Sequence, residues 1–166
     1  SERKLKKLQL NIKMYTTLLS LHSIFRWLVV IGVLYTLYRA YSGMFGKRSF
    51  DPADVKTRKY TVIVAHIQLV IGLALYFLSP ITKYFMSNFS AAVKVRDIRC
   101  YGMEHAIVMV LALALITIGS AISKKKTDDH AKFKALAIWF TIAVILVLLM
   151  TPWPFSPFSS KPFFRF

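Results

Sequence analysis

Cysteine and acidic residues are scarce in this sequence. One cysteine, Cys100, occurs among 166 residues, which excludes an internal disulfide and a Cys-x-x-Cys-His segment for covalent attachment of haem. Seven Asp and Glu residues stand against 23 Lys and Arg residues. Zinc and di-iron centres in helical bundles need carboxylate-rich ligand sets, whereas only Glu104 adjoins a long apolar run here. The composition therefore does not favour such a centre.

Apolar residues, by contrast, are abundant and concentrated. They make up 56% of the chain, and a soluble domain would spread them over amphipathic stripes. Here they form four blocks, at 18–38, 60–81, 103–122 and 135–151. Each block is close to the roughly 17–25 residues that a membrane-spanning helix needs. Since short links join most of the blocks, the sequence predicts an all-α integral membrane protein, a four-helix up-down-up-down bundle.

The formal net charge of +16 would be typical of nucleic-acid binding in a soluble protein. In this chain the Lys and Arg residues lie mainly between and outside the apolar blocks, where anionic lipid head groups attract them. We therefore expect a membrane surface as the partner, and no nucleic acid. Residues 1–17 are predicted to form a basic amphipathic arm in the membrane interface, and residues 18–151 the bundle. Residues 152–166 are predicted to be a Pro- and aromatic-rich interfacial tail; the alternative role for this tail is docking of partner membrane subunits.

Local signals predict where the helices begin and end. Asp51 before Pro52 is typical of a helix N-cap followed by proline at the first helical position. Pro80 removes a backbone donor and ends or kinks the second helix. The link over residues 82–101 is expected to be interfacial and partly helical. Asp128 and Asp129 are candidates to cap the fourth helix.

Three histidines lie within or at the edge of apolar blocks, where ionisable groups are costly and mark candidate functional sites. Counting at 1.5 Å per residue places His22 and His105 about 10 Å from the membrane midplane, on the same side. The same counting places His66 about 6 Å from the midplane on the opposite side. We therefore expect His22 and His105 to meet across the bundle, and His66 to join neither.

A pair of imidazoles on different helices is how a bundle holds a cofactor in its core. His22 and His105 are therefore predicted to be axial metal ligands of a non-covalently bound b-type haem. Arg26 and Arg99 are candidates to bind the haem propionates, and Met109 is expected to line the face below the ligand. His66 and Glu104 remain candidates for a second site or a proton path.

The alternative needs no cofactor. In it, the polar residues hold the helices together: Arg26 pairs with Glu104, and His105 bonds Tyr101 or Ser23. The chain would then be an accessory or structural subunit of a membrane complex.

Three short segments carry a resemblance to a known family. They are LHSIFRW at 21–27, AHIQ at 65–68 and GMEH at 102–105. With the rest of residues 14–166, they resemble small bacterial four-helix integral membrane proteins described as cytochrome-b-like. The resemblance implies a b-type haem, or a place beside a respiratory complex in the bacterial inner membrane.

The predicted function is thus electron transfer in or beside a respiratory complex, with a quinone as a candidate electron partner. An electron carrier or an accessory subunit is favoured over a stand-alone enzyme. When the arm is left out, the links between helices one and two and between helices three and four carry more Lys and Arg than the other side. The multi-pass chain is therefore expected to place both termini outside.

Overall fold

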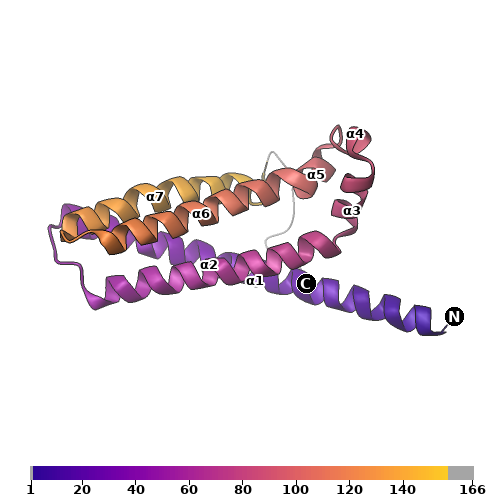
Figure 1. The fold of residues 1–166 in the computed structure, drawn as a ribbon, viewed down its shortest axis with the longest axis horizontal. Helices are drawn as coiled ribbons and strands as arrows, with labels where there is room; N and C mark the ends of the chain where they lie inside the picture. The colour runs from indigo at the N-terminus through magenta and orange to yellow at the C-terminus, as the bar shows by residue number, and fades with distance from the viewer. Residues whose placement is uncertain (1, 157–166) are drawn as a thin grey trace.

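The computed structural model describes residues 2–156 and is helical throughout its regular elements (Figure 1). Residues 157–166, which make up most of the predicted tail, lie outside the described part. The four long helices are α1 (Glu2–Phe45), α2 (Pro52–Leu78), α6 (His105–Lys125) and α7 (Asp129–Met150). Between α2 and α6 the chain forms α3 (Pro80–Ser87), α4 (Phe89–Ala92), α5 (Arg96–Arg99) and a π-helical turn, η1 (Cys100–Glu104).

The long helices pack as a bundle in which α1 contacts α2 and α7, and α6 contacts the same two helices. Fully buried side chains such as Val33, Ile116, Phe133 and Phe140 fill its core. The outward faces are also apolar, with Val70 67% exposed and Ile31 60% exposed. A helix that is apolar on all sides is suited to a lipid environment, and all four long helices are long and apolar enough to cross a membrane.

The local signals for helix ends are confirmed. Asp51 is the N-cap of α2, Pro52 occupies its first turn, and Asp51 and Asp54 form a reciprocal capping box. The helix ends at Leu78, immediately before the Ser79-Pro80 pair, and Asp128 caps α7 by accepting a hydrogen bond from Ala131. The link over 82–101 is partly helical, as expected, and its short helices pack beside α2 and η1 at one end of the bundle.

The arm differs from the expectation of a separate element. Helix α1 runs without a break from Glu2 to Phe45, which is about 66 Å at 1.5 Å per residue. Its first turns extend beyond the bundle (Figure 1), and Leu5, Leu8 and Ile12 are all more than half exposed. Nothing at residue 17 or 18 breaks the helix, because this stretch contains no glycine or proline. The arm is therefore the beginning of α1.

At the opposite end, a network of two arginines and two aspartates joins α1 to the start of α2. Arg39 Nε donates to Asp54 Oδ1 at 2.6 Å, and Arg48 donates to both Asp54 oxygens at 2.7 and 2.8 Å. Asp51 accepts two further bonds from Arg39 at 3.0 Å. Burial by itself raises the pKa of Asp54, but the hydrogen bonds from Arg48 and Arg39 outweigh it and hold that pKa well below its usual range. The network precedes the uncharged stretch 60–78 of α2 and fixes the first turn between the long helices.

Candidate functional site

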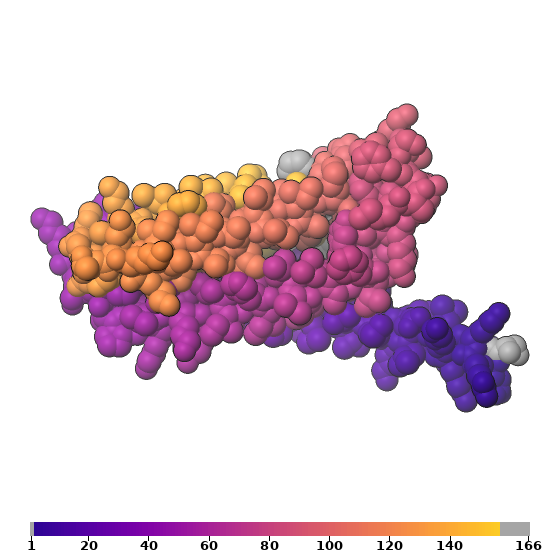
Figure 2. Space-filling model, in the orientation of Figure 1, coloured from indigo at the N-terminus to yellow at the C-terminus, as the bar shows by residue number. Residues whose placement is uncertain are grey.

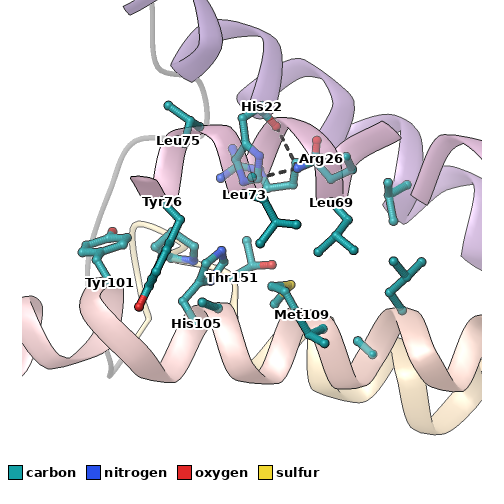
Figure 3. Close-up of a pocket in the computed structure, with 18 of the residues that line it drawn as sticks. His22, Arg26, Leu69, Leu73, Leu75, Tyr76, Tyr101, His105, Met109 and Thr151 are labelled. Atoms are coloured by element: carbon teal, nitrogen blue, oxygen red, sulfur yellow. Dashed lines mark hydrogen bonds between the residues drawn. The ribbon is translucent and has the colours of Figure 1, made fainter. Parts of the chain in front are cut away.

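A cavity of about 230 Å³ lies at the end of the bundle where α1, α2 and α6 meet the short helices. Its lining is mainly apolar, with a small set of polar side chains on the walls (Figure 3). Leu73 of α2 and Val110 of α6 line it and are also 40% and 46% exposed, so these two helices form its rim. The surface is hollowed between α6 and α2 on this side (Figure 2). An apolar cavity with few polar groups is typical of a small-molecule site.

The cavity brings together the two histidines that were predicted to meet. His22 comes from α1 and His105 from the first position of α6, and their ring centroids are 6.5 Å apart with an angle of 71° between the ring planes. Both rings belong to the cavity lining (Figure 3). The expectation that His22 and His105, on different helices, meet across the bundle is confirmed.

The protonation of His105 is fixed by its neighbour. Its Nδ1 lies 3.0 Å from the backbone carbonyl oxygen of Met150 at the end of α7. Because a carbonyl oxygen only accepts hydrogen bonds, Nδ1 must carry the proton. In the neutral ring Nε2 then keeps its lone pair, which is the usual arrangement for a histidine that binds a metal.

His22 is held against α2. Gln68 Nε2 donates to the His22 carbonyl oxygen at 3.0 Å and lies 3.4 Å from His22 Nε2. The second distance exceeds the usual range for a hydrogen bond, so the ring contact is weak. A Cβ added at Gly72 would lie 3.1 Å from His22 Cε1, which means that the absence of a side chain lets the ring approach the α2 backbone.

The π-helical turn η1 leads directly into His105. Such wider turns interrupt the regular hydrogen-bond ladder and are frequent at functional sites. Here Tyr76 of α2 donates its hydroxyl to the Gly102 carbonyl oxygen at 2.8 Å. A Cβ at Gly102 would meet the ring of Phe85 at 2.4 Å, so glycine is required for α3 to pack against η1. The turn thereby sets where α6 begins and where His105 lies.

The predicted pair of Arg26 and Glu104 is not formed. Glu104 accepts a 2.7 Å bond from Arg99, and Arg99 also donates to the Val93 carbonyl oxygen at 3.0 Å. Neither of these two residues lines the cavity. Arg26 does line it, and its guanidinium lies 5.6 Å from the Trp153 ring centroid and 5.7 Å from that of Trp27. These distances are within cation–π range.

The remaining candidates divide between the cavity and the outer surface. Met109 lines the cavity, as expected. His66 is exposed on α2, where its Nδ1 donates to the Val62 carbonyl oxygen of the same helix at 2.8 Å. His66 does not reach the cavity, in agreement with the depth estimate. Within residues 2–156, no group of three or more His, Cys, Asp or Glu side chains is placed to hold a metal ion.

Sequence reasoning missed Gln68 and Tyr76 as parts of this site. Both lie on α2 and line the cavity. Their spacing of eight residues brings them to nearly the same face of a helix, and this is the signal that could have identified them.

Comparison with known proteins does not identify the chain: no family model, no curated protein and no solved structure matches it. The resemblance to cytochrome-b-like proteins consequently remains a resemblance.

Proposed function

We propose that this chain is a multi-pass membrane protein that binds a b-type haem between His22 and His105 and takes part in electron transfer. The observation that carries the proposal is the pair of imidazoles that face one cavity from two helices, with ring centroids 6.5 Å apart. It is the arrangement that a bundle uses to hold a cofactor in its core.

The distance between the rings supports the proposal. His22 and His105 would hold the haem iron between them: imidazole nitrogens bind metals at about 2 Å, and ring centroids 6.5 Å apart would let one iron reach both rings. The porphyrin supplies the other four ligands, so a haem site needs only two protein ligands. A site with two histidines is therefore sufficient for haem, although it would be insufficient for a structural zinc ion.

The surroundings support the same proposal. The Met150 carbonyl orients His105 and leaves its Nε2 available as a ligand. Met109, Leu69 and Leu73 supply apolar walls for the macrocycle. Arg26 is the cation on the cavity wall that suits a propionate group. A haem in this position would carry one electron at a time, at a potential set by the two imidazoles and the apolar surroundings.

The wider setting follows from the helices. We propose that α1, α2, α6 and α7 cross a bacterial inner membrane in alternating directions, with both termini outside. Most exposed lysines of the links then lie inside, as expected from the charge rule for membrane proteins. The electron partner in this proposal is a membrane quinone or an adjacent subunit of a respiratory complex, and the tail after Met150 is the segment that would dock that subunit.

The test is a reduced-minus-oxidised absorbance spectrum of the purified protein, recorded for the wild type and three alanine variants. The wild type should show a low-spin b-type spectrum. His22→Ala and His105→Ala should each abolish it, because each would remove one of the two side chains proposed to hold the iron. His66→Ala is the matched control and should retain it, because His66 lies on the outer surface. A wild-type protein without haem, after expression with an adequate haem supply, would refute the proposal.

A second candidate function is a cofactor-free accessory subunit. The observation that favours it is that the site already contains bonds between elements, from His105 to Met150, from Gln68 to His22 and from Tyr76 to Gly102. Such bonds hold membrane helices together, at about 1 kcal/mol each. This candidate predicts no haem in any variant and only graded losses of stability in the histidine variants.

A further inference from the structure

Arg58 is a buried cation at the end of the bundle opposite the cavity. It lies on α2, two residues before the uncharged stretch that begins at Tyr60, and is 8% exposed. Its Nη1 donates to the backbone carbonyl oxygen of Ser120 on α6 at 3.2 Å and to the Ser120 hydroxyl at 2.8 Å. Its Nε is buried and has no hydrogen-bond partner in the described residues. The guanidinium thus connects α2 to α6 through neutral acceptors.

None of the chain's acidic residues compensates this charge. The nearest on the same helix face is Asp54, and its two oxygens already accept four bonds, from Arg39, from Arg48 twice and from the Asp51 amide. A carboxylate offers about four acceptor positions, so Asp54 has none left for Arg58.

The other six acids are used or placed elsewhere. Asp51 pairs with both Arg39 and Arg48. Glu104 pairs with Arg99, and Asp129 pairs with Lys132. Asp128 caps α7, Asp97 lies in α5 at the cavity end, and Glu2 lies in the first turn of α1. The carbonyl end of α6 contributes only a partial charge of about −0.5. A buried charge without a full counter-charge is costly, which indicates that an anion from outside the described residues completes the site.

We propose that Arg58 binds the phosphate of an anionic phospholipid at the point where the start of α2 meets the end of α6. These two helix ends lie together at one end of the bundle (Figure 1). Exposed lysines lie near Arg58 in the sequence and at the end of α6, namely Lys56, Lys59, Lys124 and Lys125. Basic side chains gathered between membrane helices, at the level where the apolar stretch begins, are the kind of group that binds anionic lipid head groups.

A lipid is the proposed occupant because both helices carry exposed apolar side chains close to the site along the helix axis. Next to the lysines, α2 exposes Ile63 and α6 exposes Ile118, 41% and 44% respectively. Acyl chains can lie against such side chains while the phosphate stays with the guanidinium. A soluble phosphate would gain only the polar half of these contacts.

The experiment measures the melting temperature of the full chain in neutral detergent, with added phosphatidylglycerol, phosphatidylcholine or inorganic phosphate. Phosphatidylglycerol at about 100 times its dissociation constant should raise the melting temperature of the wild type by at least about 5 °C. Phosphatidylcholine and inorganic phosphate should change it little. Arg58→Gln should lose most of the shift measured against its own lipid-free value, so a lower starting stability does not affect the comparison.

Two further variants separate a site from general surface charge. Lys134→Gln removes one charge from an exposed lysine on α7 and should keep the full shift. Arg58→Lys keeps the charge but loses the planar guanidinium group with its paired N–H donors, and should keep part of the shift in melting temperature. The proposal is overturned if Arg58→Gln retains the wild-type shift, if phosphatidylcholine acts as strongly as phosphatidylglycerol, or if inorganic phosphate alone reproduces the effect.

Discussion

Asp54→Asn is the substitution expected to damage the fold most through charge alone. The side chain of Asp54 is 2% exposed, and it accepts bonds from two arginines and the Asp51 amide. Asparagine has nearly the same size, so it leaves no cavity. It removes the negative charge and turns one acceptor oxygen into a donor that faces a guanidinium. Arg39 and Arg48 would then share Asp51 as their remaining acid.

The magnitude follows from how buried each partner is. Removal of one member of a fully buried ion pair costs about 3–5 kcal/mol. The side chains of Arg39 and Arg48 are 19% and 30% exposed, so water can recover part of that loss. We therefore expect a cost of about 2–3 kcal/mol, which corresponds to a fall of roughly 5–10 °C in melting temperature for a chain of this length.

The assay is thermal unfolding in detergent, followed by tryptophan fluorescence, with Asp129→Asn as the matched control. Asp129 pairs with Lys132 at 2.7 Å, but the two side chains are 38% and 24% exposed. Pairs in contact with water contribute little, so the control should unfold close to the wild type. Equal shifts in the two variants would refute the reasoning, because burial would then make no difference to the value of the ion pair.

Three other predictions concern acid, packing and the site. The folded-state pKa of Asp54 is lowered, so the contribution of Asp54 to the stability of the fold is complete above the ordinary carboxyl pKa of about 4 and is lost as pH falls further. In Asp54→Asn, the melting temperature should therefore depend less on pH below about pH 4 than it does in the wild type. Gly43→Ala should destabilise the bundle by about 1–3 kcal/mol in detergent unfolding, because the added Cβ would lie 2.3 Å from the ring of Phe133, which is fully buried. At the proposed haem site, Gln68→Leu should weaken haem binding about 10-fold in a titration, since the His22 backbone loses its hydrogen bond to α2, while His66→Ala should leave the affinity unchanged.

Most of the fold could be predicted because its signals are local. A run of apolar residues gives the length of a helix, and Asp51, Pro52 and Pro80 mark where helices begin and end. The arm shows the limit of this approach. Its composition changes from basic to apolar near residue 17, but a change in composition does not break a helix without a glycine, a proline or a competing cap.

The network around Asp54 was not predicted, for a different reason. It joins Arg39 of α1 to Asp54 of α2 across a turn in which Lys47 takes a positive φ of 51°. The sequence shows that both signs of charge occur near this turn. It does not show that the turn folds back far enough for two guanidinium groups to reach one carboxylate.

Only part of the site could be predicted, because the position of a side chain along its helix and the direction in which it points around that helix are separate quantities. Rise per residue gives the depth of each side chain, and this was enough to pair His22 with His105 and to exclude His66. Direction changes by about 100° for each residue of a helix. His105 points into the cavity, so Glu104, its neighbour in sequence, points away from it and meets Arg99 instead. The same rule places Arg26, four residues after His22, on the same helix face as His22. It does not predict the contact of Arg26 with Trp153, because Trp153 comes from beyond the end of α7. A charged residue next to a cavity-lining residue in sequence is therefore a weak candidate for the same site, whereas one three or four residues away is a strong one.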